Sequence, residues 1–547
     1  MVDFSLYAGR WIGLTETGEV ASVGQSPAAA RNAARGSHPK AYLRLAWVSP
    51  HPPHLALPAW PLHEIRAILP ESGVWLAGGP ARDLLLGRPL HDWDFAVAGN
   101  AIRLARRVAE ALDAAFYPLD KERDTGRVIA TDPATQRPIT LDFAGLRGQT
   151  IDADLRRRDF TINAMALTLD GHLLDPTGGQ ADLAARQIRL THPRSFHDDP
   201  ARLLRAVRQA NALGFRLEHG TELALRSQAA TIKTVAAERV LAELQHLIST
   251  PPATHGLQAL HQLGLLHYVL PEIEELDAIR QSWPHQYNDV WTHTLAALAA
   301  LEGLLALLKG QGRHRSVDHY ARVPAWAWPD MQKTLAPHQT ALLDYLEAEV
   351  NVEITRADLL KWGALFHDVG KHATSSVDAE GLIHFYGHEK AGVQRTQARL
   401  EALHVPNKSL RFVTTLVAEH MALVHLSQSP PPTRRAIYRF YRRTEAAGVG
   451  VVLVALADCM AVWGAKLERA HWRRQLETAH ALLAAYFERQ DEVVMPPPLL
   501  TGHDLMQMGL PQGPEIGRLL ALLREAQACG DVVTRESALA FVAEHRA

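Results

Sequence analysis

The chain has 547 residues, a formal net charge of −2 and a sequence pI of about 7.0. This length exceeds what one hydrophobic core supports, so we expect three or four domains. Hydrophobic residues make up 47% and charged residues 21%, which is ordinary for a globular protein and argues against extensive disorder. The near-neutral charge does not exclude nucleic-acid binding, because local basic faces can bind phosphates.

The cysteine count and the apolar stretches indicate the cellular compartment and whether the chain spans a membrane. Cys459 and Cys529 are the only cysteines, so the chain has neither a disulfide framework nor a four-cysteine zinc site. This favours a reducing, cytoplasmic compartment. The two longest apolar stretches, around 294–308 and 448–465, each carry an acidic residue, and the N-terminus lacks a signal-peptide pattern. We therefore expect no membrane segment.

Residues 1–60 are predicted to form a small α/β domain, to which we assign no role. Short strands are expected at 11–14 and 42–48, with a helix between them that is capped by Ser26 and has Pro27 at its first position. A linker should follow, because prolines break regular structure. The prolines of this stretch are Pro50, Pro52, Pro53, Pro58 and Pro61.

From Gly73 to about Leu190, β-like runs such as 74–77 and 95–98 alternate with helical segments such as 101–112. This alternation predicts an α/β domain with a mixed sheet and helices. Beyond Pro200, apolar residues recur almost entirely at helical spacing. The rest of the chain is therefore expected to be largely all-α.

A double-glycine turn and a pair of carboxylates form the first candidate site. Gly78 and Gly79 follow a predicted strand and precede a helix start, where glycine permits close backbone approach and free N–H groups suit phosphate. Asp92 and Asp94 begin the next predicted strand, and its period of two places both carboxylates on one face. Mg²⁺ would remove their repulsion. The alternative is a tight turn followed by a solvated strand end.

A third carboxylate, Asp142, lies on the predicted strand 139–143 and could complete a two-metal site. Together with later segments, these residues resemble the ordered motifs of the class II (bacterial-type) tRNA nucleotidyltransferase and poly(A) polymerase family. The matching segments are Gly78-Gly79-x-x-Arg82-Asp83, Asp92-x-Asp94, Arg157-Arg158-Asp159-Phe-Thr-Ile-Asn163, Asp175-Pro-x-Gly-Gly179-x-x-Asp182 and Asp198-Asp199-Pro-x-Arg202-Leu-Leu-Arg205-Ala-Val-Arg208.

The resemblance implies catalysis by Asp92, Asp94 and Asp142, in which Asp92 and Asp94 hold two Mg²⁺ ions. One ion would activate an RNA 3′-hydroxyl for attack on the α-phosphate, and the other would stabilise the departing pyrophosphate. The resemblance further implies a set of residues that bind the nucleotide. For residues 157–159, the alternative to nucleotide binding is an ordinary surface cluster of arginine and aspartate. The set is Gly78, Gly79, Arg82, Arg157, Arg158, Asp159, Asn163, Asp198, Asp199, Arg202, Arg205 and Arg208.

Residues 198–202 resemble the base-reading motif of this family, with Asp198 where glutamate is more usual. Cytosine and adenine each present an amino donor beside a ring-nitrogen acceptor, so Asp199 as acceptor and Arg202 as donor can pair with either base. Guanine and uracil present the reverse pattern. Asp198 could orient Arg202. The implied partners are tRNA, CTP and ATP.

A second candidate site resembles the HD phosphohydrolase signature at Leu365-Phe-His-Asp-Val-Gly-Lys371. The resemblance implies a metal site, and its imidazole and carboxylate donors suit a divalent transition metal such as Ni²⁺ or Mn²⁺. For His388 and His420, the alternative to metal binding is a histidine of the hydrophobic core whose ring nitrogens are hydrogen-bonded. The implied ligands are His293, His367, Asp368, His388, His420 and Asp458. Some relatives with this domain have phosphatase and 2′,3′-cyclic phosphodiesterase activity, so healing of tRNA ends is a hypothesis.

These features predict a tRNA nucleotidyltransferase that adds the 3′-terminal CCA from CTP and ATP, with no obligate protein partner. A CC-adding or A-adding enzyme, a poly(A) polymerase, or an HD phosphohydrolase with an inactive transferase head are the alternatives. Residues 310–336 are predicted to be an insertion. The predicted domains are 1–60 (accessory), 66–195 (nucleotidyltransferase head), 196–275 (neck, base template and RNA binding), 276–475 (HD phosphohydrolase) and 476–547 (helical tRNA-binding tail).

Overall fold

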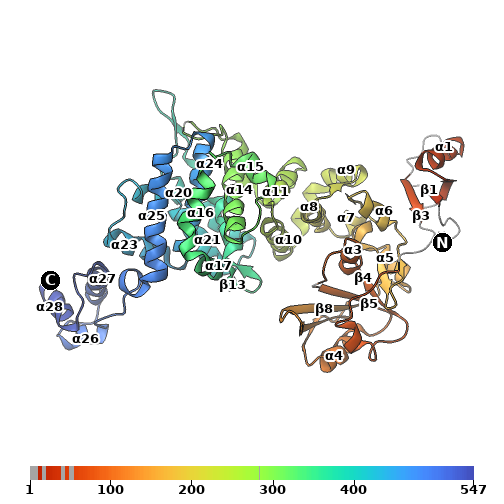
Figure 1. Ribbon diagram of the computed structural model, residues 1–547, viewed down its shortest axis with the longest axis horizontal. Helices are drawn as coiled ribbons and strands as arrows, with labels where there is room; N and C mark the ends of the chain where they lie inside the picture. Colours follow the sequence, from red (N-terminus) through yellow and green to blue (C-terminus); the bar gives the residue numbers. More distant parts are fainter. Residues whose placement is uncertain are drawn as a thin grey trace. The chain divides into compact units, whose positions relative to one another are not determined.

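The computed structural model describes residues 10–14, 20–37, 44–48, 54–90, 92–282 and 284–546. The chain divides into two compact units, Met1–Thr231 and Ile232–Ala547. The first unit, red to yellow in Figure 1, contains the large sheet, and the second, green to blue, is helical. The predicted fold class is therefore confirmed.

The N-terminal segment forms a three-stranded antiparallel sheet with one helix. Its order is β2 (Val20–Gly24), β1 (Arg10–Leu14) and β3 (Arg44–Val48), and α1 (Pro27–Ser37) packs on it. The N–H of Ala29 donates to Ser26 Oγ at 3.1 Å, which confirms the predicted cap. Strand β2 was not predicted, because its buried residue is Ser22 rather than an apolar one.

Parts of two predictions lie outside the described residues. These parts are the start of the strand expected at 42–48 and three prolines of the expected linker, Pro50, Pro52 and Pro53.

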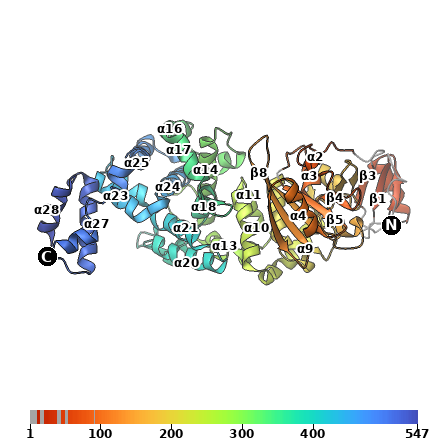
Figure 2. The ribbon, with the colours of Figure 1, turned by 90° about the horizontal axis from the view of Figure 1, so that it is seen from below.

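A seven-stranded mixed sheet forms the centre of the first unit. Its order is β10-β9-β4-β5-β8-β7-β6, in which β5 and β8 are parallel and the other pairs antiparallel. Helix α4 (Ala101–Ala111) packs on β7 and β8, and lies against the sheet in Figures 1 and 2. The strands are β4 (Val74–Ala77), β5 (Asp92–Val97), β6 (Ala115–Asp120), β7 (Thr125–Thr131), β8 (Pro138–Gly145), β9 (Ala166–Thr168) and β10 (Leu173–Leu174).

Strand β5 presents different chemistry on its two faces, as its period of two predicts. Trp93 and Phe95 are buried on one face, and Phe95 stacks on Phe143 of β8 at 4.7 Å between ring centroids. Asp92 and Asp94 therefore point to the other face. The aromatic packing holds β5 and β8 in register, and this register positions the carboxylates.

Short helices continue the first unit and bring the later motifs to the sheet. They are α3 (Gly79–Leu85), α5 (Ile151–Leu155), η2 (Thr161–Asn163), α6 (Gly179–Ala184), α7 (Ser195–Asp198), α8 (Arg202–Leu213) and α9 (His219–Gln228). Beyond Pro200 the chain is largely helical, with one two-residue strand in this unit, β12 (Arg216–Leu217), parallel to β11 (Gln187–Ile188). Such a short strand leaves no periodicity in the sequence.

The second unit is a helical bundle in which α14 (Val290–Leu308) packs on α18 (Arg356–Phe366) and α24 (Gly448–Trp463). The predicted insertion folds as α15 (Arg315–Tyr320) and α16 (Ala327–Leu335). The other main helices are α10 (Ala237–Ser249), α11 (Ala253–Gln262), α17 (Gln339–Glu347), α20 (His388–Ala402), α21 (Asn407–Glu419), α23 (Arg434–Thr444), α25 (Arg469–Glu488), α26 (Gly502–Gln507), α27 (Pro514–Cys529) and α28 (Arg535–His545). Two short hairpins, β13 (Glu349–Asn351) with β14 (Ile354–Thr355) and β15 (Ser376–Val377) with β16 (Ile383–His384), interrupt the helices.

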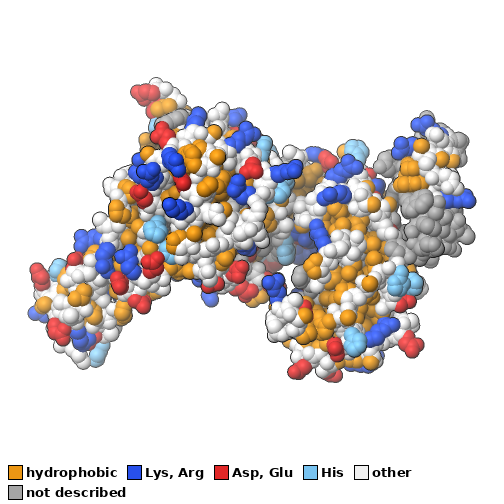
Figure 3. Space-filling view, viewed as in Figure 1, with side chains coloured by type: hydrophobic (Ala, Val, Ile, Leu, Met, Phe, Trp, Pro, Cys, Tyr) orange, Lys and Arg blue, Asp and Glu red, His pale blue; other side chains and the backbone are white. Residues whose placement is uncertain are grey.

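Two stretches of this unit, α14 and Arg434–Lys466, are long and apolar enough to span a membrane. In each, 83% of the apolar window is buried inside the fold. The face drawn in Figure 3 carries basic and acidic side chains side by side. Arg439 of α23 and Glu525 of α27 form an ion pair at 2.7 Å. The apolar helices thus serve as the core of the bundle.

A buried ion pair joins α18 to α14 and to the helices that precede them. Lys361 Nζ lies 3.3 Å from Glu302 Oε1 and donates to the carbonyl oxygens of Ile248 and Ser249 at 3.2 and 2.8 Å. The N–H of Ala253 donates to the same Glu302 oxygen at 3.0 Å. Burial raises the pKa of Glu302 and lowers the pKa of Lys361, so each charge depends on the other.

We expect Lys361→Ala to lower the free energy of unfolding of the second unit by about 3–5 kcal/mol, because it leaves a buried carboxylate without its partner. Urea unfolding followed by circular dichroism measures the change. Lys333, exposed on α16, provides the matched control, and Lys333→Ala should change stability by less than about 0.5 kcal/mol. Equal stability of the two variants would contradict this assignment.

Candidate active site and metal centre

The three candidate carboxylates lie on two neighbouring parallel strands. In the pairing of β5 with β8, Asp94 is directly opposite Asp142, and Asp92 is opposite Thr140. Burial, together with the charges of Asp142 and Asp92, raises the pKa of Asp94 to about 6, although Arg158 and Arg127 act in the opposite direction. A carboxylate in such surroundings favours the binding of a divalent cation.

Arg127 is a functional candidate that the sequence did not indicate. From β7, its Nε and Nη2 donate to the two oxygens of Asp142, each at 2.8 Å. Within the described ranges, Asp92, Asp94 and Asp142 do not gather within 4.8 Å of one another. Their oxygen donors nevertheless fit Mg²⁺, which needs few protein ligands when substrate phosphate supplies the rest.

The double-glycine turn brings backbone and guanidinium groups to the same carboxylates. Gly78 has φ +82°, and a Cβ there would lie 2.6 Å from Arg158 Nη1. A Cβ on Gly79 would lie 3.9 Å from Asp94 Oδ2 and 3.6 Å from Arg82 Nη2. A side chain at position 78 would therefore both strain the backbone and displace Arg158. The turn places the start of α3 beside Asp94.

Asp159 lies in a polar cluster beside this turn. Its Oδ1 accepts from Asn163 Nδ2 at 3.0 Å, its Oδ2 lies 3.5 Å from Arg205 Nη1, and Arg82 Nη1 donates to Asn163 Oδ1 at 2.8 Å. Burial raises the pKa of Asp159, but Arg205 and the hydrogen bonds from Asn163 and Phe160 lower it below its ordinary value overall. Asp159 is therefore ionised at neutral pH.

Arg202, of the predicted base-reading motif, is buried at the start of α8. It donates through Nη1 to Ser195 Oγ at 2.6 Å and through Nη2 to the carbonyl of Arg157 at 3.2 Å. Its Nε lies 3.9 Å from Asp199 Oδ2. Asp198 pairs instead with Arg194 at 3.8 Å. The structure thus brings Asp199, rather than Asp198, to Arg202.

The other two arginines of the predicted nucleotide set, Arg157 and Arg208, differ in exposure. Arg157 is exposed and donates through Nη1 to the carbonyl of Arg147. Arg208 is half-buried on α8.

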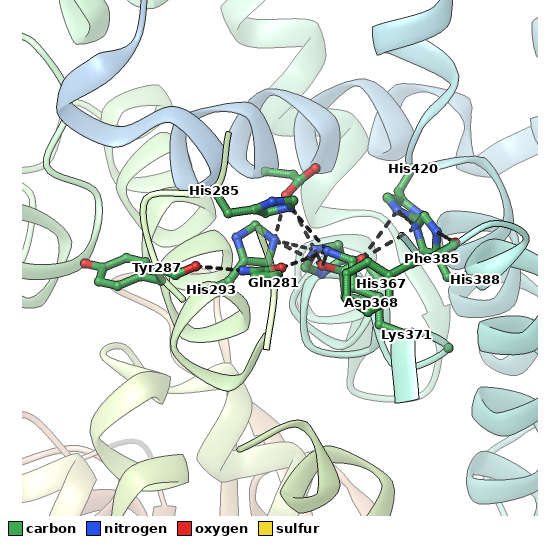
Figure 4. A network of polar contacts seen from close by, with 12 residues as sticks. Gln281, His285, Tyr287, His293, His367, Asp368, Lys371, Phe385, His388 and His420 are labelled. Carbon is green, nitrogen blue, oxygen red and sulfur yellow. Dashed lines mark hydrogen bonds and ion pairs between the residues drawn. The ribbon is translucent and has the colours of Figure 1, made fainter. Parts of the chain in front are cut away.

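In the second unit, the six predicted metal ligands form two groups of three. Figure 4 shows His293, His367, Asp368, His388 and His420 pointing toward one another. The first group is His293 on α14, His367 at the end of α18 and Asp458 on α24. His293 Nε2 lies 3.1 Å from Asp458 Oδ1 and 3.2 Å from His367 Nε2. The second group is Asp368, His388 and His420, in which the two imidazole Nε2 atoms are 3.2 Å apart.

Asp368 joins the two groups. Its Oδ2 lies 3.2 Å from both His293 Nε2 and His367 Nε2, and its Oδ1 lies 3.6 Å from His388 Nε2 and 4.0 Å from His420 Nε2. Each carboxylate oxygen therefore faces a different pair of histidines. The sequence predicted the set of six ligands but not this division.

The histidine rings are oriented for metal binding by the backbone. The Nδ1 atoms of His367, His388 and His420 each lie 2.8 Å from the carbonyl oxygen of the residue three positions earlier. Donation of Nδ1–H to these carbonyls leaves the lone pair on Nε2, which faces the other ligands. Nε2 lone pairs 3.2 Å apart repel unless a cation or a proton lies between them. The donor set therefore fits a divalent transition metal.

The pKa values of two of the histidines depend on the charges of the neighbouring ligands. Burial opposes protonation of His367, but Asp368 and Asp458 raise its pKa to about 10. Burial and the neighbouring His367 lower the pKa of His420 to about 4. The two carboxylates thus favour a positive charge at this centre.

Lys371, which ends the HD signature, contacts the centre directly. Its Nζ lies 2.7 Å from Asp368 Oδ2, 3.1 Å from Gln281 Oε1 and 3.3 Å from His285 Nε2 (Figure 4). Gln281 and His285 come from the loop before α14, where no motif in the sequence indicated them. They are further candidates for the function of this centre.

Comparison with known proteins identifies the family. Residues 74–189 match the poly A polymerase head domain, 214–276 the probable RNA and SrmB-binding site of polymerase A, and 337–463 the HD domain. The chain is 34% identical over 480 residues to the A-adding tRNA nucleotidyltransferase of Deinococcus radiodurans, covering 86% of this chain and 95% of that protein. This chain belongs to the tRNA nucleotidyltransferase family.

Other relatives of this nucleotidyltransferase differ in the activity they are named for. The CC-adding tRNA nucleotidyltransferase of Thermus thermophilus is 33% identical, covering 85% of this chain and 92% of that protein. The multifunctional CCA protein of Nitrosococcus oceani is 30% identical, covering 66% of this chain and 77% of that protein.

Solved structures have the same fold. A CCA-adding enzyme in complex with CTP has a TM-score of 0.52 at 20% identity, covering 89% of this chain and 96% of that chain. A complex with ATP has a TM-score of 0.51 at 20% identity, covering 86% of this chain and 91% of that chain.

Proposed function

We propose that this nucleotidyltransferase completes the 3′-terminal CCA of tRNA by transferring CMP from CTP and AMP from ATP. The observation that supports it most directly is the position of Asp94 opposite Asp142, with Gly79 beside Asp94 and Arg158 beside Gly78. This arrangement combines ligands for metal ions with groups that bind a triphosphate. Its residues lie in the part of the chain that matches the poly A polymerase head domain.

In this proposal, Asp92 and Asp94, with Asp142, hold two Mg²⁺ ions, which when bound supply the charge that activates the 3′-hydroxyl and stabilises pyrophosphate. The start of α3 and Arg158 orient the triphosphate. Ionised Asp159 accepts a hydrogen bond from the ribose 2′-hydroxyl and so selects ribonucleotides. Asp199 and Arg202 select cytosine and adenine through their amino donor and ring-nitrogen acceptor.

Four of the domains predicted from the sequence take separate tasks in this proposal. Residues 66–195 transfer the nucleotide, 196–275 read the base, 276–475 carry the HD centre and 476–547 hold the tRNA. We assign the protein to the cytoplasm.

A product assay tests the proposal. We expect a tRNA transcript that lacks its CCA, incubated with Mg²⁺, CTP and ATP, to gain CCA and nothing further, with both nucleotides required. Sequencing of the products decides the outcome. Addition of CC alone, of A to a transcript ending in CC, or of a long A tail would show that the enzyme has the corresponding activity and not CCA addition.

A partial activity is the second candidate, because the relatives that match along most of the chain include both A-adding and CC-adding enzymes. The head and base-reading motifs alone do not separate these activities, since each uses the same transfer step. Parallel assays with transcripts that end at the discriminator base, at C and at CC therefore resolve which additions this enzyme makes.

We further propose that the HD centre hydrolyses phosphate ester bonds at RNA ends, as a phosphatase and 2′,3′-cyclic phosphodiesterase. The six buried or nearly buried ligands and the backbone-oriented imidazoles support a divalent transition metal such as Ni²⁺ or Mn²⁺. Lys371 beside Asp368 adds a positive charge next to the metal ligands. Removal of 2′,3′-cyclic phosphate would prepare a tRNA end for nucleotide addition.

A further inference from the structure

Helix α8 contacts the nucleotide-binding segment through three side chains of one face. Arg202, Arg205 and Gln209 are spaced i, i+3 and i+7, so they follow one another along the helix. Arg202 donates to the carbonyl of Arg157, and Arg205 lies 3.5 Å from Asp159 Oδ2. Gln209 Oε1 accepts from Asn163 Nδ2 at 3.0 Å. Gln209 was not among the residues predicted from the sequence.

The orientation of both amides follows from their neighbours. Arg82 has only donors, so Asn163 must present Oδ1 to Arg82 Nη1, at 2.8 Å. The NH₂ group of Asn163 then faces Asp159 Oδ1 and Gln209 Oε1, each at 3.0 Å. Asn163 and Gln209 are both buried, with 7% and 8% exposure. The amide of Asn163 therefore has a partner for its oxygen and for both of its N–H groups.

These contacts connect α8 to the glycine turn. Gln209 holds Asn163, Asn163 holds Arg82, and the guanidinium of Arg82 lies beside Gly79, as does the carboxylate of Asp94. We infer that Gln209 is a positioning residue of the transferase site, which orients Asn163 and through it Arg82 and Asp159 for nucleotide binding. This inference rests on the proposed roles of Arg82 and Asp159.

The experiment compares Gln209→Met with Gln209→Glu. Methionine keeps the length of the side chain but offers Asn163 no oxygen acceptor, and it leaves one buried N–H unpaired. We expect the KM for the nucleotide to rise about tenfold in Gln209→Met, while kcat and the KM for tRNA change less than about twofold. The increase in KM should be the same for CTP and ATP, because Gln209 acts on residues assigned to binding of the ribose and the triphosphate. Gln209→Glu, which retains the acceptor, should restore at least half of the loss on a logarithmic scale.

Two controls separate this inference from other causes. Gln228 at the end of α9 is half-buried, and Gln228→Met should leave every kinetic constant unchanged. In a double-variant cycle, Gln209→Met should add little to the effect of Asn163→Ala, because both remove the same link. A nucleotide KM within twofold of the wild type, or additive effects in the cycle, would overturn the inference. Absence of transfer by the wild-type enzyme would instead reject the proposed function.

Discussion

Replacing Asp94 by asparagine is expected to reduce nucleotide transfer to tRNA by about a thousandfold or more. Asparagine keeps the size and one oxygen of the side chain but loses the charge that binds Mg²⁺, which corresponds to a loss of about 4 kcal/mol of transition-state stabilisation. Single-turnover transfer with saturating CTP measures the effect. Asp113, exposed in the turn after α4 with φ +49°, offers the control, because asparagine adopts this conformation readily.

The stability of the same variant separates a catalytic loss from misfolding. Burial and the charges of Asp142 and Asp92 raise the pKa of Asp94 to about 6. A carboxyl group with a raised pKa stabilises the fold when protonated, and this contribution is lost as the pH rises through 6. At pH 7 and without Mg²⁺, Asp94→Asn should therefore unfold at the same temperature as the wild type or higher. An inactive variant with a lower unfolding temperature would contradict this account, as would transfer above a tenth of the wild-type rate.

The sequence was sufficient to predict that Asp92 and Asp94 share one face of a strand, because that geometry is local. The period of two in Asp92-Trp93-Asp94 follows from strand geometry, and Trp93 on the buried face confirms it. Arg127 could not be predicted in the same way. It lies on an ordinary strand, and only the antiparallel pairing of β7 with β8 brings it to Asp142.

Residues that connect distant segments escaped sequence analysis for the same reason. Gln209 is an unremarkable polar position on an amphipathic helix until tertiary packing brings it to Asn163. In the HD centre, the motif predicted the six ligands in chain order, but the side on which each lies depends on how α18, α20, α21 and α24 pack. The strand β12 was missed because two residues carry too little periodicity, and β2 was missed because its buried residue is Ser22.

The second large effect concerns the HD centre. Asp368→Asn should reduce hydrolysis of a 2′,3′-cyclic phosphate end by about a hundredfold or more, while nucleotide transfer to an intact tRNA stays within twofold of the wild type. The reason is that the two oxygens of Asp368 face different histidine pairs, so loss of its charge weakens metal binding by both groups. Metal analysis of the purified variant, before and after reconstitution with Ni²⁺ or Mn²⁺, accompanies the assay.

Asp458→Asn separates the two groups of ligands, because Asp458 contacts only His293 and His367 among the described metal ligands. It should weaken metal binding by the first group and leave the second, so that more metal remains than in Asp368→Asn. Asp344, exposed on α17, is the matched control, and Asp344→Asn should retain full metal content and hydrolysis. Equal metal loss in Asp368→Asn and Asp458→Asn would indicate a single ion held by all six ligands. Loss of nucleotide transfer in parallel with hydrolysis would show instead that the two activities depend on one site.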